Sequence, residues 1–474
     1  MATELTQEQK IVHFLNRITF GPTAEEVNHV QSMGIPKYLE QQLHPDTIAD
    51  SLIEDKLAGL KTIRLSSREL LELYPPPKQA PTDRSMEPAG MQGPRFVIFE
   101  LQRARLLRAV YSKRQLFEGM VDFWTNHFNV FAGKGADRWL VTSYDRDTIR
   151  PHTLGRFRDL LLATAQSPAM LFYLDNWLSV GRDLPMRRLT QSLQPNRRTG
   201  LNENYARELL ELHTLGVDGG YSQKDVEEVA RCFTGWTIRR PRGEAVFHFE
   251  PRVHDPGEKF VLRTRIPAGG GMEDGIKVID LLARHPSTAN FISTKLVRRF
   301  VADDPPPSLV TRVARAFRQG DGDIREVLRT IVTAPEFYSP EAFRSKVKKP
   351  LEFVTSALRV SGAETNASPV LLRLLARMGE PLFLAFPPTG FPDLGSSWVS
   401  ADALLTRMNF VLDLASNRIS GTKVRFPDPS EDADQLIRFV APEGLAPATR
   451  AALGEANDSS RYALLLAAPE FQRR

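Results

Sequence analysis

Residues 201–220 hold the side chains of this chain that are best suited to chemistry. The segment reads LNENYARELLELHTLGVDGG. On an α-helix the positions i, i+4 and i+7 share one face, so Asn204, Glu208 and Glu211 line up. Glutamates one turn apart present ligands to metal ions in helical metalloproteins. The residues that we predict to form a polar centre here are Glu208 and Glu211 as catalytic groups, Asn204 and Arg207 as binding groups, and His213 as a metal ligand.

The same segment also has a purely structural interpretation. The glutamates would form a solvated stripe in which Arg207 pairs with a neighbouring acid. His213 falls among the apolar positions, two residues after Glu211 and off the spacing of a Glu-x-x-His ligand motif. It would then be a hydrogen-bonded histidine of the core. The spacing leaves both interpretations open.

A second polar group stands in an aromatic stretch, FWTNHFNVFAG, at residues 123–133. Polar side chains among aromatic residues need hydrogen-bond partners. A neutral imidazole is also an apt general base or metal ligand. We predict His127 as a catalytic residue and Asn126 as a binding residue, and the alternative is a buried histidine with a structural partner.

A third group lies in the long loop at residues 247–275, in the sequence RVHDPGEKF. His254 and Asp255 lead into a Pro-Gly turn that Lys259 follows, and long loops within a compact body are often functional. We predict Asp255 and Lys259 as catalytic and His254 as a metal ligand. The loop FPPTGFPDLGSSWVS holds Trp398, a predicted binding residue, and is either a cavity wall or a plain connection between helices.

If these segments meet in space, they would form a hydrolytic centre in which a divalent metal ion or an activated water does the chemistry. Lys259 or Arg207 would stabilise the developing negative charge, and the substrate would be a small molecule or a polymer. The alternative is a non-catalytic binding or accessory protein whose buried polar network fixes the helix packing. Axial ligation of haem by His127 or His213 ranks third, and nucleic-acid binding ranks fourth.

Composition excludes several classes of protein. The chain has 474 residues, with 62 Lys and Arg against 57 Asp and Glu, so the net charge of +5 is too small for a dedicated polyanion binder. The basic stretch at residues 182–200 has no aromatic residue to stack on bases, which favours a solvated loop and no nucleic acid. Walker A, dinucleotide-binding, HExxH, CxxCH and G-x-S-x-G motifs are absent from the sequence.

The pattern of apolar residues predicts a mainly α fold with one small β excursion near residues 245–265. No segment is apolar enough for a membrane span. The N-terminus lacks an export signal, which favours a cytoplasmic protein, or an exported, periplasmic one if a signal was removed. The predicted divisions are an N-terminal helical segment (1–74), a flexible connection (75–94), a central helical core (95–240), the long loop (241–275) and a C-terminal helical part that can be continuous with the core (276–474).

Several blocks together resemble the bacterial domain-of-unknown-function family numbered 1800. They are LNRITFGPTAEEV, FWTNHFNV, SPAMLFYLDN, NENYARELLELHTLGVDGGYSQKDVEEVARCFTGW, HDPGEKF, HPSTANFISTKLVRRFV and APEF. The resemblance implies no established activity or catalytic residue. It does imply relatives that are exported and that accompany members of the family numbered 1501, which is similar to alkaline phosphatases and sulfatases. A protein of that family is therefore the partner that the resemblance implies.

Overall fold

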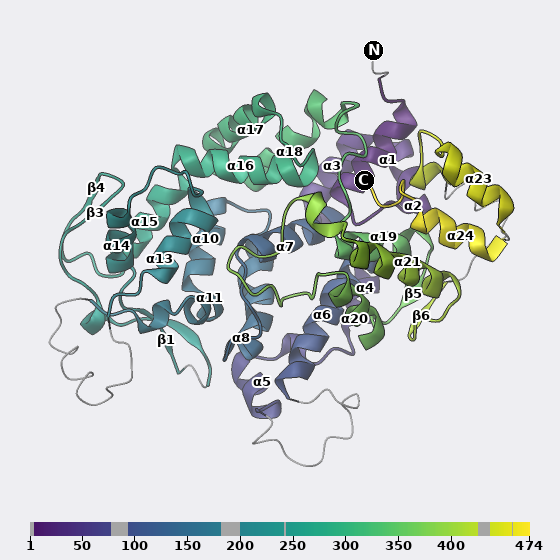
Figure 1. Cartoon of the computed structure of the whole chain (residues 1–474). Helices are drawn as coiled ribbons and strands as arrows, with labels where there is room; N and C mark the ends of the chain where they lie inside the picture. The colour runs from purple at the N-terminus through teal and green to yellow at the C-terminus, as the bar shows by residue number, and fades with distance from the viewer. Residues whose placement is uncertain (1–3, 77–92, 182–199, 241–242, 425–436, 457) are drawn as a thin grey trace.

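A computed structural model of the chain describes residues 4–76, 93–181, 200–240, 243–424, 437–456 and 458–474 (Figure 1). The connection predicted at 75–94 and the basic stretch at 182–200 lie almost entirely outside these residues. Within them the prediction of a mainly α fold is confirmed. No helix in the described ranges combines the length and the apolar character needed to cross a membrane.

The N-terminal part is helical. Three of its helices begin at capping boxes, in which Thr6, Thr23 and Ser66 each accept a hydrogen bond from the main-chain nitrogen three residues on. Its helices are α1 (Gln7–Ile18), α2 (Ala24–Met33), α3 (Ile35–Leu43), α4 (Ser51–Leu57), α5 (Ser67–Leu73) and α6 (Pro94–Tyr111), with 3-10 turns at Pro45–Thr47 and Thr62–Arg64.

The middle of the chain surrounds α7, which lies near the centre of Figure 1. It contains α7 (Gln115–His127), α8 (Asp137–Ser143), a π-helix (Tyr144–Ile149), α9 (Arg150–His152), α10 (Phe157–Gln166), α11 (Pro168–Tyr173), a 3-10 turn (Asn176–Leu178), α13 (Asn204–Glu208), a second π-helix (Leu209–Thr214) and α14 (Gln223–Cys232).

The C-terminal part is again helical, and proline occupies the first turn of many of its helices. It contains α15 (Glu273–Ala283), α16 (Pro286–Phe300), α17 (Pro307–Gln319), α18 (Ile324–Val332), α19 (Pro350–Val360), α20 (Pro369–Arg377), α21 (Ala401–Ala415), α23 (Pro447–Glu455) and α24 (Asp458–Ala467), with 3-10 turns at Pro251–Val253, Pro335–Tyr338 and Gly395–Trp398.

The helix at residues 204–214 departs from the α-helical register assumed above. It is α-helical only to Glu208 and then continues as a π-helix. The Leu215 nitrogen donates to the Leu210 oxygen at 2.8 Å, which is the i to i+5 pattern of a π turn. The α-helical register assumed for Asn204, Glu208 and Glu211 therefore ends at Glu208, and the turn that carries Glu211 is wider than an α-helical turn.

The β structure near residues 245–265 consists of two small sheets. The strand at Val246–Phe249 pairs with a strand just before it, and the segment at 259–266 folds back on itself. Leu262 and Arg263 have φ of 47° and 64°, as a tight two-residue hairpin turn requires. All pairs in the described chain are antiparallel: β1 (Trp236–Arg239) with β2 (Val246–Phe249), β3 (Lys259–Val261) with β4 (Thr264–Ile266), and β5 (Glu364–Thr365) with β6 (Thr422–Lys423).

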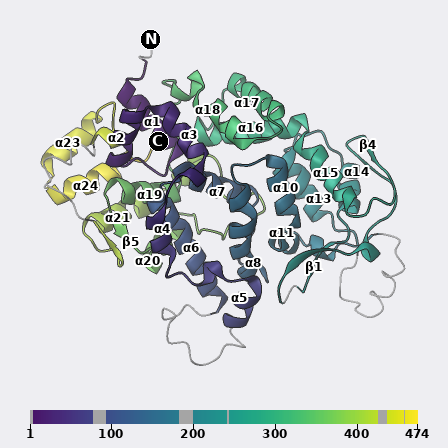
Figure 2. The same ribbon diagram turned by 180° about the vertical axis from the view of Figure 1, so that it is seen from behind.

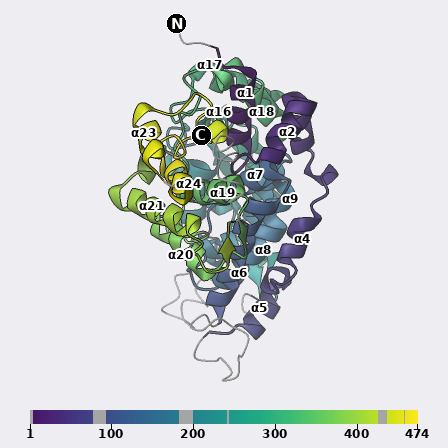
Figure 3. The same ribbon diagram turned by 90° about the vertical axis from the view of Figure 1, so that its right-hand side faces the viewer.

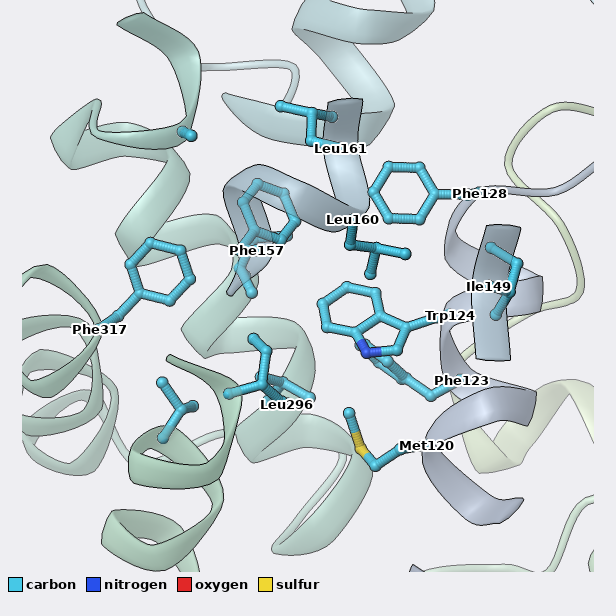
Figure 4. Packing of buried hydrophobic residues seen from close by; sticks show 14 of the residues in the cluster. Met120, Phe123, Trp124, Phe128, Ile149, Phe157, Leu160, Leu161, Leu296 and Phe317 are labelled. Atoms are coloured by element: carbon cyan, nitrogen blue, oxygen red, sulfur yellow. The ribbon is translucent and has the colours of Figure 1, made fainter. Parts of the chain in front are cut away.

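Two large hydrophobic cores support the fold. The first core joins α1 to α3 with α7 and α10 to α18, and Figure 4 shows Trp124, Phe128 and Phe157 packed together at its centre. The Trp124 indole lies 5.9 Å from the Phe157 ring and donates to the Thr153 oxygen at 2.9 Å. The second core joins α6 with α19 to α21 and α24. Figures 1 and 2 show α10, α14 and α15 of the first core on one side of the molecule and α19 to α21 and α24 of the second core on the other, with α1 to α3 of the first core next to the second.

The C-terminal segment returns to α1. Arg474 Nη1 lies 3.5 Å from the Asn16 oxygen, and Val347 forms a β-bridge with Arg473. Figure 3 shows the C-terminal end close to α1 in a side view. Residues from the two ends of the described chain are thereby held in one part of the fold.

Candidate functional site

The glutamates of residues 201–220 lie side by side and are partly buried. Burial raises the pKa of Glu208, and the negative charge of Glu211 raises it further. Glu211 accepts a hydrogen bond from the Tyr221 hydroxyl at 3.0 Å. Arg207 donates to Gln223 at 2.8 Å and lies on the exposed side of the helix. The two predicted catalytic carboxyl groups therefore remain neighbours in spite of the π turn.

His127 and His213 are buried next to one another. His127 Nε2 lies 3.1 Å from the His213 main-chain oxygen, to which it donates. The two ring centres are 6.3 Å apart. Burial lowers the pKa of His213 to about 3, and burial together with the Lys295 charge holds the pKa of His127 well below its ordinary value. Both imidazoles are therefore neutral at physiological pH.

His254, Asp255 and Lys259 form a separate buried cluster with Asp274. Lys259 Nζ donates to Asp274 Oδ2 at 2.6 Å and to the Asp255 main-chain oxygen at 2.5 Å. His254 Nε2 lies 3.2 Å from the same Asp274 oxygen. Asp255 accepts two hydrogen bonds from Arg231, at 2.9 and 3.1 Å. These side chains are tied to one another and hold the loop before β3 against α15.

The structure brings together only part of the predicted set. Within the described ranges, no hydrogen bond or ion pair joins the cluster of His254, Asp255 and Lys259 to the side chains of His127, Glu208, Glu211 or His213. Figure 1 shows β3 and β4 at the edge of the molecule, away from α7. Among the same residues, no group of three or more His, Cys, Asp or Glu side chains is placed to hold a metal ion. The catalytic and metal-binding roles of these residues stay predictions.

A polar pocket that the sequence did not indicate lies along α7. Its free volume is about 40 Å³, enough for a few water molecules. Asp122 and Asn126 are one turn apart on α7 and share the face that lines it. The side chains around the pocket are Arg105, Asp122, Phe123, Thr125, Asn126, Asn129, Arg299, Lys349, Glu380, Leu382, Phe383, Phe391 and Asp393.

A pair of interacting carboxyl groups dominates this pocket. Glu380 is buried, and its Oε2 accepts a hydrogen bond from the Leu351 nitrogen at 2.7 Å. Burial, followed by the negative charge of Asp122, raises the pKa of Glu380 to about 8. Asp122 keeps 20% of its side chain exposed, and its Oδ1 lies 3.4 Å from Arg105 Nη1. At neutral pH Glu380 therefore carries a proton beside an aspartate that faces solvent.

Cations border the pocket opposite this pair. Asp393 lies 2.7 Å from Lys295 and 3.6 Å from Lys349. Burial opposes the ionisation of Asp393, but the charges of Lys349 and Lys295 outweigh burial and hold its pKa below the ordinary value. Arg299 pairs with Glu352 at the same border. The pocket thus combines a proton donor, a carboxylate and several positive charges.

The loop that holds Trp398 forms one wall of this pocket. Asn126 holds this loop through two hydrogen bonds. Its Oδ1 accepts from the Phe391 nitrogen at 2.7 Å, and its Nδ2 donates to the Phe391 oxygen at 3.0 Å. Gly390 has a φ of +71°, and a Cβ there would lie 2.5 Å from the Asn126 main-chain oxygen, so glycine is required. Trp398 donates to the Pro392 oxygen at 3.3 Å. Of the two predicted binding residues, Asn126 therefore lines the pocket, and Trp398 lies behind it against Phe391, with ring centres 6.2 Å apart.

The family comparison covers almost the whole chain. The family model described as "Protein of unknown function (DUF1800)" matches residues 13–473. The chain belongs to this family. No curated protein and no solved structure matches it. Membership in DUF1800 assigns no reaction.

In this DUF1800 chain the pocket escaped prediction because its residues are scattered along the sequence. Arg105, Asp122, Arg299 and Glu380 come from α6, α7, α16 and the turn after α20. Only Asp122 had a local signal, since it lies four residues before Asn126 in the FWTNHF block. Glu380 stands alone in MGEP, and no spacing rule connects it to a residue more than 250 positions earlier.

The Glu380→Gln variant is expected to gain stability relative to the natural protein as the pH rises. The ordinary pKa is 4.5 and the folded value is about 8, so folded Glu380 keeps a proton that the unfolded chain has lost between these values. The stability from this group is complete below pH 4.5 and is lost as the pH rises through 8. Glutamine does not ionise, so the difference between the proteins should grow by on the order of 3 kcal/mol.

Denaturant unfolding at pH 5 and pH 8.5 measures this difference. Glu341→Gln is the matched control, because Glu341 is exposed. An equal shift in both variants, or a constant difference at the two pH values, would contradict the raised pKa of Glu380.

Proposed function

We propose that this protein is a hydrolytic enzyme that works by acid–base catalysis at the Asp122–Glu380 pocket. One observation carries the proposal: two carboxyl groups in different environments face a pocket that has room for water. Neighbouring titratable groups whose environments push their pKa values apart are a recurrent basis for dividing acid and base roles. A protonated Glu380 suits the acid, and Asp122, which reaches solvent, suits the base.

The proposed reaction transfers two protons. Asp122 takes a proton from a water molecule as the water oxygen attacks the substrate. Glu380 gives its proton to the leaving group, whose bond to the attacked atom breaks. Arg299 and Lys349 stabilise the negative charge that develops on the attacked group. Before the next reaction, Asp122 has to lose its proton and Glu380 has to regain one. This happens when the proton on Asp122 passes through solvent to Glu380.

A second candidate is the non-catalytic binding or accessory protein, with a member of the family numbered 1501 as its partner. The observation that favours it is the buried cluster around Asp274, where His254, Lys259 and Asp255 are all engaged with other protein groups. Such a network fixes the packing of a large helical body. This candidate requires no turnover at the pocket.

Hydrolysis of chromogenic esters, glycosides, phosphoesters and amides tests the first proposal. Asp122→Asn and Glu380→Gln are each expected to lower turnover by about 10²- to 10⁴-fold, the usual contribution of one proton-transferring group. Asp304→Asn and Glu341→Gln are matched controls on exposed residues and should keep full activity. Activity that survives in both pocket variants would place the reaction elsewhere. A protein inactive on every substrate class would put the accessory candidate first.

The predicted divalent metal ion has its own test. Elemental analysis compares the protein without a histidine tag with a variant in which Asn204, Glu208 and Glu211 are replaced by alanine. A near-stoichiometric metal that the variant loses would support the metal-assisted version of the proposal at residues 201–220. A metal retained by the variant would have to be bound elsewhere.

A further inference from the structure

Beyond Lys349 and Asp393 the carboxyl-pair pocket adjoins a smaller one that is rich in cations. Its free volume is about 10 Å³, which is close to the space of one water molecule or one ligand oxygen. Arg299, Lys349 and Asp393 line both pockets. The charged side chains of the smaller pocket are Lys295, Arg298, Arg299, Lys346, Lys349, Arg474, Glu352 and Asp393, and we call this set the cation cluster.

Positive charge exceeds negative charge in the cation cluster. Six of its side chains are basic and two are acidic. Each acid is shared: Asp393 between Lys295 and Lys349, and Glu352 between Arg299 and Arg474. A further carboxylate, Asp303, pairs with Lys346. Even with Asp303 counted, three carboxylates face six basic groups.

This excess charge is largely removed from water. The exposed fractions of the side chains are 9% for Arg299, 5% for Lys346 and 3% for Arg474. Uncompensated charge in such surroundings is costly, and a bound counter-ion relieves that cost. Lys295 and Lys349 are more open, at 16% each, so a ligand can approach from their side.

Buried arginines in and near the cation cluster retain hydrogen-bond donors without a partner within the described chain. Among the described residues, Arg474 Nε is buried without a hydrogen-bond partner. Arg17 of α1 is fully buried behind the cluster, where it interacts with the charges of Glu352, Arg299 and Asp303, and its Nε and Nη1 are also unpaired within the described chain. Buried polar groups normally have hydrogen-bond partners. Arginine N–H groups that lack a partner are well suited to bind an oxyanion.

We propose that the cation cluster binds one oxyanion group of the substrate, a phosphate or a carboxylate, and so makes the substrate an anionic molecule. One oxygen of the group would fill the small pocket, and the bond to be cleaved would lie next to Asp122 and Glu380. This inference rests on the proposed function, because it places the anchored group beside the carboxyl pair. The cluster sets the substrate class, and the pair performs the proton transfers.

Inorganic phosphate and acetate are the probes, each compared with chloride at equal ionic strength. Thermal unfolding is expected to shift upward by several degrees in 10 to 50 mM of at least one oxyanion, because a ligand that binds only the folded state stabilises it. A response to phosphate alone identifies a phosphate-type group, and a response to acetate alone identifies a carboxylate. Equal curves in all three salts would overturn the proposal.

Variants locate the effect. Arg298→Gln and Lys349→Met should each weaken oxyanion binding, measured by calorimetry, by at least about tenfold, since each removes a charge-assisted contact worth more than 1.4 kcal/mol. Arg315→Gln and Lys277→Met, on exposed positions of α17 and α15, are the matched controls. Equal weakening in the controls would mean non-specific salt binding and would overturn the site.

The failure of this proposal is distinguishable from failure of the hydrolase proposal. Asp122→Asn and Glu380→Gln should keep oxyanion binding within about threefold, because neither removes a cation. If the protein binds the oxyanion but has no hydrolytic activity, the oxyanion site is supported and only the proposed reaction is contradicted. If the protein hydrolyses neutral substrates but binds no oxyanion, the oxyanion site is contradicted and the proposed reaction is supported.

Discussion

Replacing His127 and His213 by leucine is expected to make the folded protein less sensitive to acid. The pKa of His213 falls from 6.5 to about 3 on folding, and the pKa of His127 also lies well below 6.5. Above pH 6.5 both states are neutral at these positions and the stability that they contribute is complete. As the pH falls below 6.5, the two histidines bind protons in the unfolded chain but not in the folded protein, so the free energy of unfolding decreases.

The size of the effect follows from the number of protons. Each histidine adds a slope of about 1.4 kcal/mol per pH unit, so the double variant should fall about 2.7 kcal/mol per pH unit less steeply below about pH 6. Urea unfolding from pH 7 to pH 4.5 measures both slopes. The slope is independent of any constant loss caused by the substitutions themselves.

A control separates this effect from general acid unfolding. His29→Leu, at an exposed position of α2, is the control variant measured over the same pH range. The single variant His213→Leu should remove about half of the effect, and it is the fallback if the double variant does not fold. Parallel profiles for natural and variant proteins would show that the two imidazoles titrate normally in the folded state.

Lys259→Met is expected to destabilise the protein by about 3 to 5 kcal/mol, the usual result of removing one partner from a buried ion pair. Lys259 and Asp274 are both fully buried, 2.6 Å apart. Methionine fills a similar volume but leaves the Asp274 carboxylate with His254 as its remaining side-chain partner. Denaturant unfolding at pH 7 measures the loss.

A second substitution shows whether the unpaired charge is the cause. In Lys259→Met combined with Asp274→Asn no net charge is left behind, so at least half of the lost stability should return. Lys277→Met, on the exposed side of α15, is the matched control and should change little. A Lys259→Met variant that unfolds like the natural protein would contradict the structural role and revive the predicted catalytic role of Lys259.

The sequence predicted the fold better than the site, for physical reasons. Helices can be recognised locally, from the spacing of their apolar residues. The π turn after Glu208 was not foreseen, since an i to i+5 bond leaves no simple mark in the sequence. The strand at Val246–Phe249 was recognised, but its partner, Trp236–Arg239, was hidden in a helical-looking block.

Of the described residues that line the carboxyl-pair pocket, only Asn126 had been singled out from the sequence, because of its aromatic surroundings. Its predicted binding role stays a prediction. Glu380 was missed because its raised pKa depends on burial and on Asp122, which only tertiary structure brings near. Conversely, Lys259 was predicted to be catalytic because the sequence does not reveal that its ammonium group forms an ion pair with Asp274.

The two hydrophobic cores meet at the carboxyl-pair pocket, and this gives the pocket a mechanical property. Asp122 and Arg299 stand on helices of the first core, while Arg105, Lys349 and Glu380 belong to segments of the second. A small sliding of one core past the other would change the distance between Asp122 and Glu380, and with it the contribution of the Asp122 charge to the raised pKa of Glu380. The pKa of Glu380 would therefore respond to the relative position of the two cores.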